Sequence, residues 1–181
     1  MFRYVCSQRG FSLTELMMTV AIAATVMAFG VPMVTDVTAT IKLNEAARML
    51  ERELQDARLK AVSTNRPLRV RTNCPAAGFL RTVEVLNTAV DSASNRCLPS
   101  AYPFPADDNM VTRPNHDGPV RVVPNGATVT TATYQFHPDG TVFAVVSNVA
   151  TRITAEQTMT VTRNNRSRTV RINGAGKIQL Q

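Results

Sequence analysis

The sequence predicts an α+β fold in which one long N-terminal helix packs on a C-terminal antiparallel β-sandwich-like domain. Residues 11–31 form an apolar stretch of about 20 residues, the length that a transmembrane helix requires. After residue 67 the chain alternates short strand-like runs with turn dipeptides such as Asn-Gly. With 181 residues and 44% hydrophobic content, it can hold one membrane helix and one modest globular domain.

A single carboxylate, Glu15, lies within the apolar stretch, which is otherwise interrupted only by hydroxyl and small residues. A charged side chain at membrane depth costs about 2.5–3.5 kcal/mol on insertion scales, and such groups usually find an internal partner. We therefore expect Glu15 to act through a partner. The alternative is a polar residue that is tolerated near the helix end.

The charges that flank the stretch predict its orientation. Arg3 and Arg9 precede it, so the positive-inside tendency places residues 1–10 in the cytoplasm and the bulk of the chain across the membrane. A cleavable secretory signal peptide is the alternative, but its apolar core would be shorter and would end in an Ala-x-Ala type site. The Ala-Ile-Ala at residues 21–23 lies mid-span.

The helical pattern continues through residues 32–64 as an amphipathic helix. Apolar residues recur at spacings of four and three, which places them on one helix face: Leu43, Ala47, Leu50, Leu54, Ala57 and Ala61. The residue before a proline avoids the α conformation, so the Asn-Arg-Pro at residues 65–67 should end the helix. We expect its first half in a membrane or filament core and its second half packed on the domain.

Residues 65–181 are predicted to form the β-rich domain. Alternating runs indicate strands over residues 68–71, 82–86, 120–123, 128–136, 141–146, 159–162 and 169–172. Turn signals separate several of them, at Asn125-Gly126, Asp139-Gly140, Asn164-Asn165 and Asn173-Gly174. Residues 87–119 are rich in proline and are predicted to form a long excursion from the sheet.

Residues 10–17 read GFSLTELM, and Pro32 directly follows the apolar stretch. This segment resembles the class III signal of type IV prepilins and type II secretion pseudopilins, whose helices commonly have a proline at this place. The resemblance implies that a prepilin peptidase cuts between Gly10 and Phe11 on the cytoplasmic side. It also implies that the same enzyme methylates the new Phe11 amine.

The resemblance implies partners and a location as well. Residues 1–10 would be the leader peptide, and residues 11–31 the transmembrane and later filament-core helix. Glu15 would pair with the N-terminal ammonium of a neighbouring subunit, since two charges in a low-dielectric medium gain from pairing what each loses by desolvation. The expected partners are prepilin peptidase, other pilins or pseudopilins and the bacterial inner membrane, with the C-terminal domain in the periplasm and later in a pilus or pseudopilus.

Two segments in the C-terminal half of the chain indicate which group of these prepilin-like proteins it resembles. Residues 137–140 read HPDG and residues 170–180 read VRINGAGKIQL, which is similar to the GspH/FimT group of minor pilins and pseudopilins. That group implies a pilin-like fold and a role in assembly or at the tip of a type IV pilus or a type II secretion pseudopilus. The sequence has no Ser-His-Asp order, paired-carboxylate motif or phosphate-cradling glycine loop, so neither enzyme activity nor a cofactor is expected.

Of the three cysteines, Cys6 lies in the leader, which leaves Cys74 and Cys97 in the exported part. An oxidising periplasm favours a Cys74–Cys97 disulfide, which would stabilise the fold by about 3 kcal/mol in the chain-entropy model. Two free thiols are the alternative, because sequence spacing does not show that the Cα atoms approach closely enough. No metal site is expected, since His116 and His137 lack ligand spacing and cysteine partners.

Charge supports a second hypothesis, DNA uptake by a minor pilin. The formal net charge is +7, and removal of Arg3 and Arg9 with the leader leaves 18 basic against 13 acidic residues, or +5. Residues 157–181 contain no acidic residue and five cations: Arg163, Arg166, Arg168, Arg171 and Lys177. Such a patch would bind double-stranded DNA through its phosphates, largely without sequence preference and with steep salt dependence.

Competence proteins of the FimT group have a Gly-Arg-x-Arg element that contacts DNA, whereas this chain reads GKIQ at residues 176–179. Alternation along a strand would place Arg166, Arg168 and Lys177 on one face, with Arg171 elsewhere. The alternative interpretation is an edge hairpin that is charged to prevent aggregation.

A second basic group surrounds the predicted C-terminus of the helix. Its members are Arg58, Lys60, Arg66, Arg69 and Arg71. We interpret them as favourable charges at the negative end of the helix dipole.

Overall fold

The computed structural model describes residues 10–104, 116–124 and 126–181. The predictions that concern Arg3, Cys6, Arg9 and Asn125, and those for residues 105–115 of the excursion, lie outside the described residues. The chain divides into two compact units, Met1–Thr38 and Ala39–Gln181.

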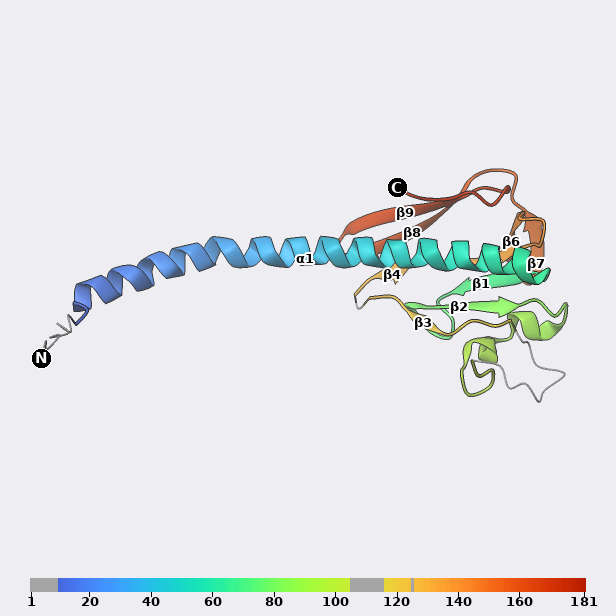
Figure 1. Ribbon diagram of the computed structural model, residues 1–181, viewed down its shortest axis with the longest axis horizontal. Coiled ribbons are helices and arrows are strands. Elements are labelled where there is room, and N and C mark those ends of the chain that lie inside the picture. The colour runs from blue at the N-terminus through green and yellow to red at the C-terminus, as the bar shows by residue number, and fades with distance from the viewer. Residues whose placement is uncertain (1–9, 105–115, 125) are drawn as a thin grey trace, which may run out of the picture. The chain divides into compact units, whose positions relative to one another are not determined.

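Helix α1 runs without interruption over Leu13–Thr64, as the sequence predicts (Figure 1). Asn65 ends it in the left-handed conformation, with a φ of 53°. The Arg66 amide donates to the Ala61 carbonyl (3.2 Å), and the Asn65 amide donates to the Val62 carbonyl (3.4 Å). These two bonds form a Schellman motif, which satisfies carbonyls of the last turn.

The predicted apolar face of the helix is buried in the Ala39–Gln181 unit. All six of its residues are at most 3% exposed, and Ala46 joins them. Leu59 of the same helix is 66% exposed, so burial is confined to one face. The interval of three and four residues therefore predicted the packed face correctly.

Six antiparallel strands form the larger sheet, in the order β3-β2-β1-β5-β6-β7. Their bounds are Leu68–Thr72 (β1), Phe79–Glu84 (β2), Arg121–Val122 (β3), Thr133–Phe136 (β5), Val142–Val146 (β6) and Val149–Arg152 (β7). The sequence patterns did not predict β7. It follows a two-residue turn in which Ser147 and Asn148 have φ values of 48° and 65°, the conformation of tight hairpin turns.

The smaller sheet has four antiparallel strands in the order β10-β9-β8-β4. Their bounds are Thr128–Val129 (β4), Gln157–Arg163 (β8), Arg166–Ile172 (β9) and Ile178–Leu180 (β10). The predicted Asn164-Asn165 turn joins β8 to β9, with φ values of 47° and 59°. Both central strands are longer than the alternating pattern indicated.

The single strand predicted over residues 128–136 is wrong, because the chain leaves one sheet and enters the other within it. The β4 segment pairs with β8, whereas β5 pairs with β1. At the crossing the Thr72 hydroxyl shares its one proton between the carbonyls of Thr130 (2.9 Å) and Ala132 (3.1 Å) and accepts from the Ala132 amide (2.7 Å). A side chain thus satisfies the backbone groups that a continuous ladder would have paired.

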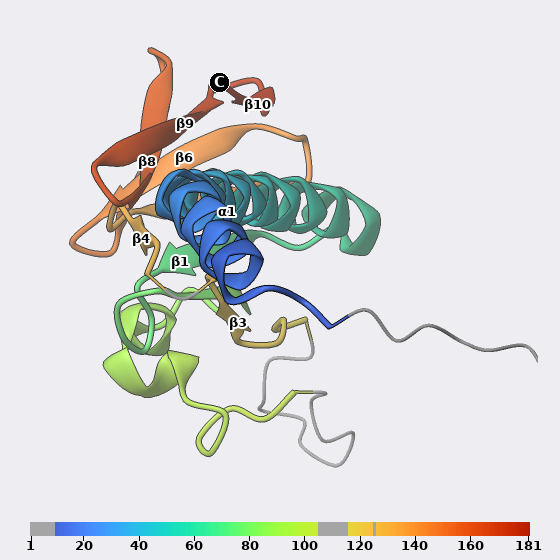
Figure 2. The ribbon, with the colours of Figure 1, turned by 90° about the vertical axis from the view of Figure 1, so that its left-hand side faces the viewer.

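The two sheets meet the helix from different sides, with β8 and β9 on one side and β1 to β3 on the other (Figures 1 and 2). The core that they share contains Leu50 and Leu54 of α1, Phe136 of the larger sheet, and Met159 and Val170 of the smaller one. All five are completely buried. The predicted class, a long helix packed on an antiparallel sandwich-like β domain, is therefore confirmed.

Candidate functional site

The residues of the predicted processing site lie at the start of the helix. Gly10 and Phe11 precede α1 and are exposed, Phe11 by 81%. The amides of Glu15 and Leu16 each donate to the Ser12 carbonyl at 3.1 Å, so the first helical turn begins immediately after the Gly10–Phe11 peptide bond. A peptidase could therefore approach this bond without unfolding a regular element.

Glu15 lies in the first turn of α1, where its negative charge is favoured by the helix dipole. Large apolar side chains after it are exposed in the Met1–Thr38 unit, by between 51% (Val37) and 81% (Phe29). One helix among the described residues is long and apolar enough to cross a membrane, and it is α1.

Hydroxyl groups within the apolar stretch are satisfied by the helix itself. Thr19 donates to the Leu16 carbonyl (2.9 Å), and Thr25 donates to the Ile22 carbonyl (2.8 Å). In a bilayer an unsatisfied hydroxyl would cost free energy, and these local bonds remove that cost. The polar residues of the stretch are thus compatible with a membrane-spanning helix.

The five cations of the predicted DNA patch do not share one face. Arg168 pairs across the ladder with buried Val161, so it lies on the face of the smaller sheet that meets the core, and its Nε donates to Asn44 Oδ1 of α1 (2.9 Å). Arg166, two residues earlier on the same face, donates to the Thr40 hydroxyl. Arg163 stands opposite Arg166 in the register.

Arg171 and Lys177 lie on the opposite face of this sheet. Arg171 pairs in register with Gln179, and its Nη1 donates to a Glu156 carboxylate oxygen at 3.3 Å. Lys177 precedes Ile178, which is buried, so alternation directs Lys177 to the Gln179 side. The expectation that Lys177 shares a face with Arg166 and Arg168 is therefore wrong, because the pleat of β10 reverses it.

The C-terminal glycine turn that carries Lys177 is built on Arg58 of α1. Arg58 donates to the carbonyls of Gly140 (3.4 Å, from Nε) and Ala175 (3.3 Å, from Nη2), which joins the HPDG turn to the GAGK turn. Gly176 has a φ of 81°, and a Cβ there would lie 2.3 Å from Arg58 Nε and 2.4 Å from the Gly140 carbonyl oxygen. The glycine is required for this close packing.

The second basic group does not neutralise the helix C-terminus, so that interpretation is wrong. Its members bind other parts of the unit: Arg58 the two turns, Lys60 the His116 carbonyl, Arg66 the Glu84 carboxylate, Arg69 the side chains of Gln135 and Asn148, and Arg71 the carbonyls of Ser92 and Ala93. The helix end is already capped by backbone amides. These cations therefore connect loops and strands to one another.

Cys74 and Cys97 form the predicted disulfide, with Cα atoms 5.5 Å apart, so the alternative of two free thiols is wrong. Cys97 ends a pair of short 3-10 helices, η1 (Ala89–Ser92) and η2 (Ser94–Cys97), in the proline-rich excursion. The bond ties this excursion to the chain just after β1.

A buried ionic network beside the disulfide was not foreseen from the sequence. Asp117 accepts from Arg96 through both carboxylate oxygens (3.0 and 3.1 Å) and from the Glu84 amide (2.7 Å). Arg81 donates to the carbonyls of Gly118, Arg96 and Tyr102. Arg81 and Arg96 are 1% and 0% exposed. The only available signal was a set of charged residues in a segment without periodicity.

The ring of His137 contacts two side chains of the larger sheet. The His137 ring stacks on Phe143, with centroids 4.3 Å apart, and its Nε2 is 2.9 Å from Gln135 Nε2. Burial lowers the pKa of His137, and nearby Asp139 opposes that effect. Among the described residues no group of three His, Cys, Asp or Glu side chains could hold a metal ion.

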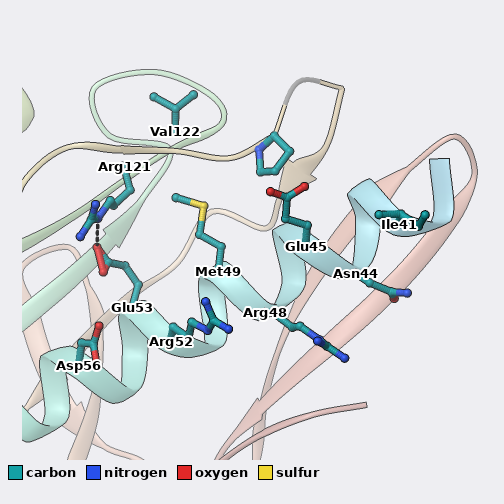
Figure 3. A pocket seen from close by; sticks show the side chains of 11 residues that line it. Ile41, Asn44, Glu45, Arg48, Met49, Arg52, Glu53, Asp56, Arg121 and Val122 are labelled. Atoms are coloured by element: carbon teal, nitrogen blue, oxygen red, sulfur yellow. Dashed lines mark hydrogen bonds and ion pairs between the residues drawn. The ribbon is translucent and has the colours of Figure 1, made fainter. Parts of the chain in front are cut away.

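An open groove of about 790 Å³ lies between α1 and β3 in the Ala39–Gln181 unit (Figure 3). Arg121 crosses it and donates to Glu53 at 3.2 Å. Burial raises the pKa of Glu53, whereas Arg121 lowers it. The lining contains three acidic side chains (Glu45, Glu53 and Asp56) and three basic ones (Arg48, Arg52 and Arg121), so the groove has no net charge to select an ion.

Two family models match the chain. The family model described as "Type II transport protein GspH" matches residues 46–176, and the model of the prokaryotic N-terminal methylation motif matches residues 6–31. No curated protein matches the chain at a significant level.

Two crystal structures of the type IV minor pilin FimU from Pseudomonas aeruginosa strain PAO1 resemble the chain. The structure in space group P21 is 20% identical with a TM-score of 0.49, and the alignment covers 80% of this chain and 92% of FimU. The structure in space group P65 is 21% identical with a TM-score of 0.46, covering 77% and 92%.

The GspH match spans most of the chain, and the methylation motif covers the segment around the Gly10–Phe11 bond. The matched family is described as a type II transport protein. The protein thus belongs to the GspH family of minor pilins and pseudopilins and carries their N-terminal methylation motif.

Proposed function

We propose that this protein is a minor pilin or pseudopilin subunit that a prepilin peptidase cuts between Gly10 and Phe11 and methylates at Phe11. It acts in assembly, or at the tip, of a type IV pilus or a type II secretion pseudopilus. Its parts are a leader (1–10), a transmembrane and filament-core helix (11–31), an amphipathic continuation (32–64) and a β-rich domain (65–181). The observation that carries the proposal is an exposed Gly10–Phe11 bond directly before an exposed apolar helix.

The exposure of the apolar helix supports an anchored subunit that later joins other pilins. Its side chains from Leu13 to Val37 cover none of the described core. Apolar surface of this extent needs lipid or neighbouring helices around it. The basic start of the chain supports a cytoplasmic N-terminus in the bacterial inner membrane, and the Cys74–Cys97 disulfide supports a periplasmic domain.

Glu15 has the assembly role in this proposal. The carboxylate lies four residues after Phe11, and its desolvation in the bilayer is relieved by the methylated ammonium of an adjacent subunit. This ion pair would stabilise an incoming subunit electrostatically at the base of the filament. Substitution by glutamine keeps the size of the side chain and removes the charge.

The test is expression with the native peptidase and filament proteins, followed by mass spectrometry of the N-terminus. We expect a chain that begins with methylated Phe11, and a Gly10→Val variant that keeps its leader. A Glu15→Gln variant is expected to be processed but depleted from filaments, while the neighbouring uncharged change Thr14→Val leaves incorporation normal. A mature N-terminus after residue 23 would instead identify a secretory signal peptide and contradict the proposal.

DNA capture for natural transformation is a second candidate, which the exposed side chains of Arg166, Arg168 and Lys177 favour. If it is correct, the full chain in neutral detergent binds double-stranded DNA with an affinity that falls steeply with salt. Arg166→Gln/Arg168→Gln and Arg171→Gln/Lys177→Gln remove equal charge from the two faces of the sheet. Unequal losses would locate the DNA surface, and no binding at low salt would exclude this function.

A further inference from the structure

The groove between α1 and β3 combines the edge of a sheet with the exposed side of a helix. Among the described strands, β3 ends the larger sheet and has a neighbour, β2, on one side. Val122 of β3 and Ile41 of α1 line the groove and are 55% and 60% exposed. A strand at the edge of a sheet presents backbone N–H and C=O groups with which another extended segment can pair. The groove therefore offers backbone pairing on one wall and side-chain contacts on the other.

The helix wall presents a carboxylate, an apolar side chain and an ion pair at regular intervals. Glu45, Met49 and Glu53 are four residues apart, and in Figure 3 all three point toward β3 and the chain that follows it. Successive members of this series are about 6 Å apart along the helix axis. Alternate residues of an extended strand are about 6.6–6.8 Å apart and lie on the same face. Every second residue of a strand in the groove can therefore meet one member of the series.

The two ends of the series carry opposite charges that can still bind a partner. Glu45 is exposed and has no hydrogen-bond or ion-pair partner in the part of the chain that the structure describes. Arg121 donates to Glu53 from Nε (3.2 Å), and its Nη1 and Nη2 make no other hydrogen bond to a described residue. Its side chain is 53% exposed. Between them, Met49 is partly buried against the core.

We propose that this groove binds an extended segment of a neighbouring filament subunit, which pairs with β3 and carries a cation, an apolar residue and a carboxylate at alternate positions. The cation binds Glu45, the apolar side chain contacts Met49, and the carboxylate binds the guanidinium fork of Arg121. Helix residues 41–56 extend over about 22 Å, the length of about six or seven extended residues. This inference rests on the proposed function, which supplies the neighbouring subunit.

The other charges of the lining fit a peptide better than a nucleic acid. Arg48 points away from β3 in Figure 3, and Arg52 and Asp56 are opposite charges one helical turn apart. A nucleic acid brings only negative charge, which Glu45 repels. A peptide with both signs of charge satisfies Glu45 and Arg121 together.

The experiment uses the full chain in neutral detergent and fluorescent seven-residue peptides, with fluorescence anisotropy as the measure of binding. One peptide contains threonine except for lysine, valine and glutamate at its second, fourth and sixth positions, and another carries the three in reverse order. A control peptide has the same composition with lysine and glutamate adjacent. The test variant is Glu45→Lys. Glu156→Lys makes the same charge reversal at an exposed acid outside the groove.

We expect one ordered peptide to bind about tenfold more tightly than the control peptide, through its two charge-assisted contacts. Glu45→Lys should lose this preference, a peptide with glutamate in place of lysine should restore it, and Glu156→Lys should retain it. Methylation of alternate peptide amides should abolish binding in only one of the two possible sets, because alternate amides point to opposite edges of a strand. Equal affinity for ordered and control peptides, or no restoration by the exchanged charge, would overturn the proposal.

A photocrosslinker in place of Ile41 tests the occupant in cells that assemble filaments. We expect a light-dependent adduct with another pilin subunit, located by mass spectrometry in a segment that carries the three-residue pattern. An adduct with a second copy of this chain, or with a protein outside the filament, would contradict the proposed occupant. Peptide binding by a chain that is never cut between Gly10 and Phe11 would refute the proposed function and leave the peptide groove intact.

Discussion

At the residue scale, one carboxylate organises the excursion that follows β2. Asp117 is 3% exposed and is the nearest acid to both Arg81 (3.7 Å) and Arg96 (3.0 Å), each of them buried. The Arg96 guanidinium also stacks over Tyr102, 4.9 Å from the ring centre. Backbone carbonyls accept further hydrogen bonds from Arg81 and from Arg96 Nη2, which stabilises two buried cations around one acid, whereas Arg96 Nη1 has no hydrogen-bond partner among the described residues.

Replacement of Asp117 by asparagine should therefore destabilise the protein strongly. The variant leaves two buried guanidinium groups without a counter-charge, and breaking such a pair costs about 3–5 kcal/mol. Urea unfolding of the purified chain in detergent measures the change, with exposed Asp56→Asn as the control. A loss below about 1 kcal/mol would show that solvent reaches the arginines.

His137 should make stability dependent on pH. Burial lowers the pKa of its imidazole, so the unfolded chain binds the proton more readily than the folded one. Stability is therefore full above the ordinary histidine pKa, about 6.5, and declines as the pH falls through it toward the lower folded value.

Thermal unfolding at a series of pH values between neutral and mildly acidic measures this effect. A His137→Gln variant should lose the decline. Asp139, whose pKa is lowered mainly by the hydrogen bond from the Thr141 hydroxyl, loses its contribution in a more acidic range and is distinguishable. An unchanged profile in the variant would assign the dependence to another group.

At the element scale, α1 supplies the surface on which both sheets close. Leu54 is completely buried in the core, whereas Leu59 on the same helix is 66% exposed. Leu54→Ala should cost about 2–5 kcal/mol through lost burial and the cavity that remains. Leu59→Ala is a matched control with the same change in propensity and should be nearly neutral. Equal unfolding midpoints for both would contradict the packing of this face.

The sheets also show which features of the strands local sequence patterns can predict. β8 and β9 pair through seven residues each, and their hairpin was predictable from an Asn-Asn turn between alternating runs. The break between β4 and β5 was not, since it depends on Thr72, which is more than 55 residues away in sequence. Alternation of apolar and polar residues predicts a strand, but it does not predict the sheet to which that strand belongs.

At the scale of the whole molecule, the disulfide closes a loop of 23 residues between β1 and the excursion. Cys74→Ser/Cys97→Ser should lower the free energy of unfolding by about 3 kcal/mol, because the unfolded chain gains loop entropy. Urea unfolding measures this, and reduction of the wild-type chain should reproduce it. A reduced protein as stable as the oxidised one would show that the ionic network alone holds the excursion.

The N-terminal signal, the length and buried face of the helix, the helix end and most strands were predictable from the sequence. These features depend on residues close together in the chain, whose periodicity and capping chemistry are local. The pairing of Cys74 with Cys97 was also correct, since only two cysteines follow residue 10.

The grouping of the cations, in contrast, became visible only in the folded chain. Arg166 and Arg168 bind the helix, Arg171 and Lys177 lie on the far face, and the second basic group connects loops instead of capping α1. A sequence shows which residues are charged but not where their side chains point. The pleat of each strand and the contacts of distant segments give each guanidinium its direction, and both arise only when the chain is folded.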